Sequence, residues 1–354
     1  MARIKTRILI ISDTHGHTPA SSRASADLSP TSDFAVAVTG YRLPLPAADV
    51  VLHCGDLTTR STPPELSRTL NMLRGLRAPL KIIIPGNHDR LLDAAFWHDD
   101  AGGYNDPEYH TEALELLRAA EEDDGIVYIG GHSEGAHTFP LANGAVLRLY
   151  ASPWTPEYGV WGFQYRPEDG HAFDIPAGID IAMTHGPPRD VLDLAGFALP
   201  QFNMQPTPAG CPDLFAAVAR ARPRVHCFGH IHEAWGAYLA RWKTGDHAPG
   251  PATAEQAIDA ARSRSIVALA DIKPMTHLHP PATPAQVEQL MDWSAKMGVS
   301  IDWEKETGAA DEDGRVGGEH TLFVNAAIEG YRQEPSQLPF IVDMLLDEVP
   351  PSSS

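Results

Sequence analysis

The chain has 354 residues, of which 43% are hydrophobic and 21% charged, and its formal net charge is −19. This length can supply a sizeable core, as one large domain or two ordinary ones, and the composition argues against global disorder. The negative charge disfavours docking on an extended nucleic acid, but a small anionic substrate is not excluded, because bound cations can dominate the field of a site.

The N-terminal half alternates short apolar runs with helical patterns. The runs Ile8–Ile11 and Val50–His53 have the length and the Ile and Val content of buried strands. A helix is predicted to begin at Pro63, because the leucines at positions 66, 70, 73 and 76 share one helical face. A further strand is predicted at Leu80–Ile84, and a second helix at Thr111–Ala120.

The C-terminal half continues the same pattern. Apolar runs predict strands at Val146–Tyr150, Ile179–Met183 and Val225–Phe228, and Asp213–Ala221 has the pattern of a helix. Strands that alternate with helices in this way indicate a layered α/β architecture.

Three segments read as additions to this framework. Thr18–Pro46 is rich in Ser, Pro and Ala and predicts a long surface loop, and Ser133–Ala142 predicts a polar connection between strands. The largest is Thr244–Gly318, interpreted as an insertion within a single domain that spans residues 5–345. Residues 346–354 are expected to form a disordered tail.

The cysteines and the apolar runs indicate the compartment. Cys54, Cys211 and Cys227 are odd in number and share no repeated spacing, so they predict no disulfide framework and no CxxC zinc site. The first apolar run is too short for a signal peptide, and no stretch approaches the length of a membrane span. We therefore expect a soluble, cytoplasmic protein with no membrane partner.

Five polar motifs lie directly after predicted strands, where an α/β sheet presents its loops to ligands. They are Asp13-Thr14-His15, Gly55-Asp56, Gly86-Asn87-His88-Asp89, Thr184-His185-Gly186 and Gly229-His230-Ile231-His232. Each motif alone arises often by chance, but five in order, each in the same structural context, indicate a shared site.

The residue types in these motifs favour a metal centre. Because side chains of an extended segment alternate, the D-x-H and H-x-H spacings place two donors on one side, where both can bind one ion. Carboxylates together with imidazoles suit manganese, iron or zinc. Two such ions about 3.5–4 Å apart can hold both the attacking and the leaving oxygen of a phosphoryl displacement. The glycines at positions 55, 86 and 229 allow sharp turns close to the ions.

With these motifs the sequence resembles the calcineurin-like metallophosphoesterase superfamily. It is most similar to the branch of small metallophosphoesterase-domain-containing proteins and cyclic-nucleotide phosphodiesterases. The narrower likeness rests on the segments Ala151–Pro156, Trp161–Phe163, Thr184–Pro188, Arg222–Glu233 and Phe323–Ala327. It covers about residues 5–242 and 320–345. The resemblance implies two stacked mixed β-sheets flanked by α-helices.

The resemblance also implies a role for each motif residue. The first metal would be bound by Asp13, His15 and His232, and the second by Asn87, His185 and His230. Asp56 would bridge the two ions, and His88 would be a catalytic residue near the scissile phosphate. A bridging metal-bound hydroxide would attack phosphorus, and His88 would neutralise developing charge or protonate the leaving oxygen.

Two positions refine the comparison. Protein serine/threonine phosphatases of this superfamily carry the longer motif GDxVDRG, whose second aspartate orients the catalytic histidine. Here Thr59 stands at that position, which counts against a dedicated protein phosphatase. Some relatives replace the first histidine of the last motif with glycine and turn over poorly, whereas this chain keeps His230, so a complete second site is expected.

Other candidate residues fit ordinary structural roles. His277 and His279 repeat the H-x-H spacing, but no strand precedes them, which favours a surface position. The remaining histidines outside the motifs are interpreted as structural or solvated: His53, His110, His132, His137, His171 and His226. Trp154, Trp161 and Phe163 could stack on a nucleobase or pack beneath the site, and both interpretations stay open.

The sequence therefore predicts a dinuclear, metal-dependent phosphoesterase that hydrolyses a small phosphodiester, with a cyclic nucleotide as one candidate. A phosphomonoesterase or protein phosphatase on the same site is the first alternative. A nucleotide-binding interaction module with little catalysis is the second, although a pure scaffold would not need a complete set of metal ligands.

Overall fold

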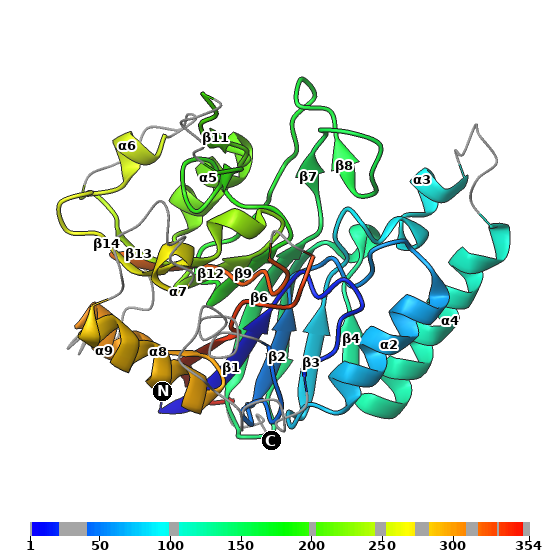
Figure 1. Cartoon of the computed structure of the whole chain (residues 1–354), viewed down its shortest axis with the longest axis horizontal. Coiled ribbons are helices and arrows are strands. Elements are labelled where there is room, and N and C mark those ends of the chain that lie inside the picture. The colour runs from blue at the N-terminus through cyan, green and yellow to red at the C-terminus, as the bar shows by residue number, and fades with distance from the viewer. Residues whose placement is uncertain are drawn as a thin grey trace, which may run out of the picture.

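The computed structural model describes residues 2–20, 41–98, 106–197, 203–244, 253–272, 283–308, 318–330 and 333–349. Within these residues, two large mixed sheets pack against each other and helices cover their outer faces (Figure 1). The predicted α/β fold class is confirmed.

The first sheet has six strands. In spatial order they are β15 (Val299–Asp302), β17 (Phe340–Asp347), β1 (Arg3–Ile11), β2 (Val50–His53), β3 (Leu80–Ile83) and β4 (Ile126–Tyr128). The strands β1 to β4 run parallel, whereas β17 is antiparallel to β1. The carboxyl ends of β1, β2 and β3 therefore lie at the same edge of this sheet.

The second sheet has seven strands. In spatial order they are β14 (Arg264–Ala268), β13 (Gly236–Arg241), β16 (His320–Asn325), β12 (Val225–Phe228), β9 (Ile181–Thr184), β6 (Val146–Ser152) and β5 (Gly135–Pro140). The four central strands are parallel, and the outer strands β13, β14 and β5 pair antiparallel. Two short ladders, β7 (Thr155–Pro156) with β8 (Gln164–Tyr165) and β10 (Leu194–Ala195) with β11 (Thr207–Pro208), lie outside the sheets.

The main core lies between the two sheets. Alternation along β1 directs Ile8 and Ile10 toward the second sheet, whereas Leu9 and Ile11 contact the helical layer. Along β12, Cys227 faces the first sheet in the same way. Both faces of these strands are buried, so their sequences are nearly continuous apolar runs, which is why the sequence predicted them.

Three helices cover the outer faces. The first sheet is covered by α2 (Pro63–Arg74) and α4 (Pro107–Asp124), and the second sheet by α5 (Pro212–Ala221). Each begins with proline at its first turn, where the missing N–H has no intrahelical partner anyway. The short helix α3 (Ala94–His98) and 3-10 turns at Arg90–Leu92, Gly131–Ser133 and His232–Ala234 complete this part of the fold. Among the described residues, no helix combines the length and hydropathy that crossing a membrane requires.

Two of the predicted additions were partly wrong. Most of Ser133–Ala142, predicted as a connection, is the edge strand β5, whose side chains alternate between half-buried and exposed positions. An edge strand with one solvated face keeps a polar composition, which hid it from the sequence pattern. The end of the predicted surface loop packs into the core, where the Tyr41 side chain is 1% exposed. Residues 21–40 of that loop lie outside the described residues.

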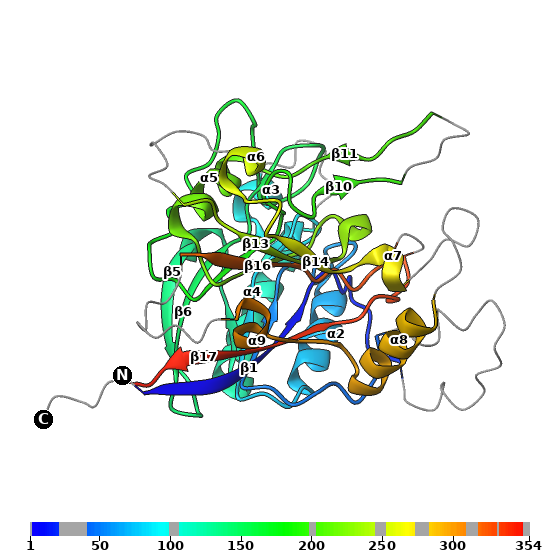
Figure 2. The same cartoon turned by 90° about the vertical axis from the view of Figure 1, so that its left-hand side faces the viewer.

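The segment 244–318 adds to both sheets. It supplies β14 at one edge of the second sheet and β15 at one edge of the first. It also contains the helices α6 (Ala254–Ala257), α7 (Leu269–Ile272), α8 (Pro284–Lys296) and α9 (Trp303–Thr307), and Figure 2 shows α8 and α9 on the same side of the molecule as β17. Trp293 and Trp303 reach the core between the sheets. The assignment of one domain over residues 5–345 stays a prediction. The strand β17 continues past the predicted start of the tail, and residues 350–354 lie outside the described residues.

Two histidines within strands contact the segments that carry the predicted metal ligands. His53 and His226 are fully buried, and the Nε2 atom of each lies 2.8 and 2.9 Å from the hydroxyls of Thr14 and Thr184, respectively. Burial lowers the pKa of both imidazoles to about 3. They are therefore neutral structural residues, as the sequence predicted.

These buried histidines predict a pH dependence of stability. An unfolded histidine binds its proton near pH 6.5, so stability is complete above that pH and falls as pH drops toward 3. Between pH 6.5 and 4.5 each histidine should lower the free energy of unfolding by about 2–3 kcal/mol. Urea unfolding of the metal-free chain should show this slope, and a His226→Gln variant should show a slope shallower by about one proton. An unchanged slope would contradict the assigned neutral state.

Candidate metal centre

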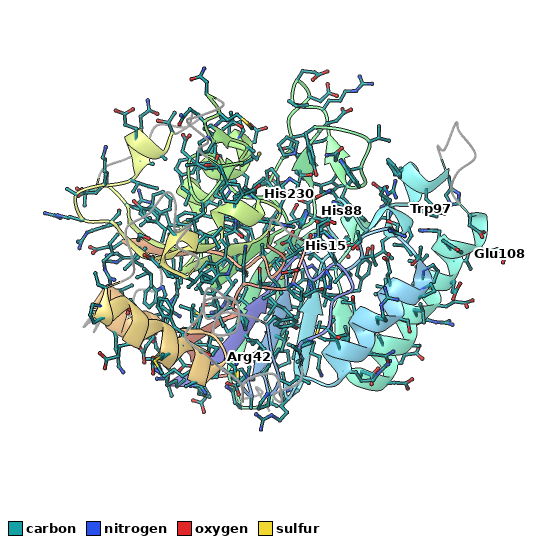
Figure 3. All side chains as sticks on the ribbon, viewed as in Figure 1. His15, Arg42, His88, Trp97, Glu108 and His230 are labelled. Atoms are coloured by element: carbon teal, nitrogen blue, oxygen red, sulfur yellow. The ribbon has the colours of Figure 1, made fainter. Side chains whose placement is uncertain are left out.

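The five polar motifs meet at one end of both sheets. Asp13, Asp56 and Asn87 follow the parallel strands β1, β2 and β3, and His185 and His230 follow β9 and β12 of the other sheet. Figure 3 shows the labelled side chains of His15, His88 and His230 close together at this end. The loops that carry the five motifs therefore lie together in the fold.

Four of the predicted ligands form a compact group. Donor atoms of Asp13, His15, Asp56 and His232 all lie within 4.8 Å of one another. His232 Nε2 is 3.2 Å from Asp13 Oδ1 and 3.4 Å from His15 Nε2. Asp56 Oδ2 lies 3.5 Å from His15 Nε2. These four side chains could bind one cation.

The other predicted ligands lie on the far side of Asp56. His185 Nε2 is 2.9 Å from Asn87 Oδ1 and 3.5 Å from Asp56 Oδ1. The His230 ring lies 4.9 Å from the His185 ring, centroid to centroid. The two carboxylate oxygens of Asp56 thus face different groups of donors, as a bridging ligand requires.

The orientation of the histidines fits a cation at each position. His15 Nδ1 lies 3.1 Å from the carbonyl oxygen of Thr58, and His185 Nδ1 lies 2.9 Å from that of Cys54. A carbonyl only accepts, so each neutral ring carries its proton on Nδ1 and directs the Nε2 lone pair into the site. At His185 this lone pair faces two acceptor oxygens, and such acceptors converge favourably only around a positive ion.

The backbone of the ligand loops adopts unusual conformations. Asp13, His15, Asp56 and His230 have φ angles of 51°, 46°, 54° and 69°, in the left-handed region that non-glycine residues rarely occupy. Such strain is typical of functional sites, where the surrounding fold holds the residue in place. Gly55 has φ of 105°, and a Cβ atom there would lie 2.5 Å from His185 Nδ1, so this position requires glycine.

Burial controls the charges of the site. Burial lowers the pKa of His15 to about 4 and that of His230 well below its usual value, which keeps both imidazoles neutral and able to bind a metal. Burial, followed by repulsion from Asp13, raises the pKa of Asp56 well above its usual range. Burial opposes ionisation of Asp13 too, but the hydrogen bond to His232 holds its pKa well below that of an ordinary aspartate. Bound cations would favour the charged form of both carboxylates.

His88 occupies the position expected of a residue that contacts substrate. Its backbone N–H donates to Asp56 Oδ1 at 2.9 Å, and its ring Nδ1 lies 3.1 Å from the carbonyl oxygen of Thr59. The backbone of Thr59 thus orients this imidazole, although the side chain found there in protein phosphatases is missing. With Nδ1 engaged, Nε2 is the ring nitrogen left for a ligand in the cleft that His88 lines.

Residues 6–234 match the family of calcineurin-like phosphoesterases. The chain belongs to the calcineurin-like phosphoesterase family. This confirms the predicted family and agrees with the stacked mixed sheets described above.

Individual relatives of this calcineurin-like chain match only in part. Metallophosphoesterase domain-containing protein 1 from Homo sapiens is 28% identical over 242 residues, which cover 65% of this chain and 62% of the human protein. The probable rhamnogalacturonate lyase C of Emericella nidulans is 32% identical over 202 residues, covering 56% of this chain and 16% of that protein. The chain thus spans less than two thirds of each relative. A purple acid phosphatase from yellow lupin (Lupinus luteus) seeds shares 14% identity and a TM-score of 0.33, over 69% of this chain and 40% of its own.

Three residues beside the metal-site loops were not predicted from the sequence of this calcineurin-like chain. The carboxylate of Asp89 accepts hydrogen bonds from the backbone of Leu57, Thr58 and Gly86 at 2.8–2.9 Å, and thereby joins two ligand loops. Its adjacency to His88 in the third motif was the only available signal. Glu329 and Tyr158 line the same cleft, of about 290 Å³, from sequence positions far from any motif.

The three aromatic residues that the sequence analysis left open differ in their surroundings. Phe163 is buried in the core, whereas the Trp161 ring lies 4.2 Å from the His88 ring, centroid to centroid. Trp154 is partly buried and packs against Phe163. Phe163 and Trp154 therefore have a packing role. Of the three aromatic side chains, Trp161 is the one that contacts a predicted catalytic residue, His88. His277 and His279 lie outside the described residues.

Proposed function

We propose that this chain is a metal-dependent phosphoesterase that hydrolyses a small phosphodiester. The observation that carries the proposal is the convergence of seven donor side chains, Asp56 and six others, from five loops and two sheets. A structural role alone does not explain lone pairs and carboxylates that face one another in a buried site.

Each predicted ligand would bind one or both of two cations. Asp13, His15 and His232 would hold one cation, and Asn87, His185 and His230 the other, with Asp56 between them. Two divalent cations there, with manganese, iron and zinc as candidates, would lower the pKa of a water molecule and neutralise charge on the phosphoryl group. As the imidazolium, with its Nδ1 proton on the Thr59 carbonyl, His88 would donate the Nε2 proton or a hydrogen bond to the departing oxygen in the cleft that it lines.

The charges that line the cleft favour a diester. Glu233 and Glu329 are among its lining residues, and none of the described lining residues is lysine or arginine. Two carboxylates repel a dianionic monoester more strongly than a singly charged diester, and this repulsion opposes the attraction that bound cations would exert on either ester. On this side-chain contribution we propose a small diester, for which a cyclic nucleotide is one candidate, over a phosphomonoester or a phosphoprotein.

Two chromogenic substrates test this proposal. The chain is stripped of metal, reloaded with Mn²⁺ and assayed with bis-4-nitrophenyl phosphate and with 4-nitrophenyl phosphate. We expect the larger kcat/KM with the diester, and no hydrolysis of either substrate when a chelator replaces the metal. A preference for the monoester would favour the phosphomonoesterase, and a metal-loaded chain that binds nucleotide but hydrolyses no ester would favour the binding module.

A further inference from the structure

The loop between β7 and β8 lies directly against the third motif. The backbone N–H of Gly162 donates to the carbonyl oxygen of Asn87 at 3.0 Å, and Trp161 lies against the ring of His88. Between these contacts and β7, the hydroxyl of Tyr158 accepts a hydrogen bond of 2.8 Å from the side-chain amide of Asn87. One loop thus contacts the backbone of Asn87 and the side chains of both Asn87 and His88.

Tyr158 combines an exposed ring with a specific hydrogen bond. Its side chain is among the exposed large hydrophobic groups, at 58% of full exposure. The hydroxyl reaches Asn87, and the ring lies 5.3 Å from that of His230, centroid to centroid. An exposed ring gains little stability from burial. The feature that sets Tyr158 apart from other exposed side chains is therefore its contact with Asn87 and His230, both predicted ligands of the same cation.

The hydrogen bond holds the side-chain amide of Asn87, which the proposed function takes as a metal ligand. An asparagine amide can turn over with almost no change of shape, exchanging its oxygen for its nitrogen. Asn87 Oδ1 lies 2.9 Å from the lone pair at His185 Nε2. In the absence of a cation that contact favours the reversed amide, whose NH₂ group would donate to the imidazole. The Tyr158 hydroxyl accepts from the amide nitrogen here and could donate to the oxygen of the reversed amide, so it holds the side chain in place in either orientation, and a bound cation would select the oxygen.

We propose that Tyr158 is a positioning residue for the second cation, whose hydroxyl holds the side-chain amide of Asn87 in place beside the metal position. The inference rests on the proposed function, because it takes Asn87 as a metal ligand. It assigns to the loop between β7 and β8 a role in the affinity of one cation and not of the other. Partners of metal ligands typically contribute a factor of about 10–100 in metal affinity.

The test measures metal binding directly. Stepwise Mn²⁺ binding to the metal-free full chain is followed by isothermal titration calorimetry for the wild type, Tyr158→Phe and Val160→Ala. Phenylalanine keeps the ring and removes only the hydroxyl. Val160 lies in the same loop with its side chain 80% exposed, so its truncation is the matched control. We expect Tyr158→Phe to weaken one of the two Mn²⁺ sites by about 10–100-fold and to leave the other unchanged, while Val160→Ala resembles the wild type.

A second background tests whether Tyr158 acts through Asn87. In an Asn87→Ala variant the hydroxyl of Tyr158 has no side-chain amide to hold. Adding Tyr158→Phe to this background should therefore change Mn²⁺ affinity far less than it does in the wild type. With Asn87 in place, the Mn²⁺ concentration for half-maximal hydrolysis should rise in Tyr158→Phe.

The outcomes separate this inference from the proposed function. A wild-type chain that binds fewer than two Mn²⁺ ions would overturn both. Two bound ions, with equal affinities in the wild type and Tyr158→Phe, would overturn the role of Tyr158 and leave the proposed function standing. If Tyr158→Phe causes the same loss of affinity with Asn87 in place as in the Asn87→Ala background, Tyr158 does not act through Asn87, which also overturns the inference.

Discussion

Asp56→Asn is expected to lose bound metal and phosphoesterase activity together. The two oxygens of Asp56 face His15 and His185 at 3.5 Å each, so this carboxylate joins the two halves of the site. Asparagine keeps the shape but offers one neutral oxygen, so two bound cations would lack the negative charge that Asp56 would place between them. We expect kcat/KM to fall by at least about 10³-fold, since interactions of this kind contribute several kcal/mol.

Metal analysis by mass spectrometry and hydrolysis of bis-4-nitrophenyl phosphate provide the measurements for Asp56→Asn. The matched control is Asp292→Asn, which removes a carboxylate from an exposed ion pair with Lys296 and should leave both readouts unchanged. Thermal melting of the metal-free chain checks the fold. Burial already raises the pKa of Asp56, so a neutral side chain there should not lower the melting temperature. An active and fully metallated Asp56→Asn variant would disprove the bridging role.

His88→Ala is expected to lower kcat by a factor on the order of 10²–10⁴ while metal content stays near that of the wild type. His88 lines the cleft, its ring is held by the carbonyl oxygen of Thr59, and its hydrogen bond to Asp56 comes from the backbone N–H, which alanine keeps. Its removal should therefore affect the chemical step and leave the cations in place. Metal content and kcat measured on one preparation separate the two effects.

The choice of leaving group sharpens the test of His88. A general acid matters most when the departing oxygen is strongly basic and least for a nitrophenolate, which leaves without a proton. The loss in His88→Ala should thus be larger for an alkyl diester than for bis-4-nitrophenyl phosphate. Equal losses would indicate that His88 only stabilises charge on the phosphoryl oxygens, and loss of metal would move it among the ligands.

The sequence was most informative about strands that are buried on both faces. β2, β9 and β12 consist almost entirely of apolar side chains, so their positions were predicted within a few residues. The strand β17 was missed because Asp343 interrupts its apolar run. That carboxylate binds the guanidinium of Arg7 on the neighbouring strand at 2.7 and 2.8 Å, a pairing that only the sheet register creates.

In the predicted site, too, the sequence identified some residues and only the structure identified the others. The donor residues were recognisable because each stands directly after a strand and has the chemistry that a metal requires. Tyr158, Glu329 and the Thr59 carbonyl escaped prediction, because an exposed tyrosine, a lone glutamate and a backbone oxygen carry no motif. Their relevance comes from position alone: Tyr158 is 71 residues from the asparagine that it contacts.

The amino-acid sequence by itself determined which side chains can donate to a metal and the order in which the strands carry them. Only the tertiary structure decided which donors lie close enough to bind the same cation. It also decided which oxygen of Asp56 faces which histidine, and how Asn87 and His88 are oriented. These properties depend on distances between loops of two different sheets, up to 219 residues apart in the chain. Such distances follow from how the sheets pack, because a metal ligand set is selected by distance and lone-pair direction in space, and local sequence spacing constrains neither across separate loops.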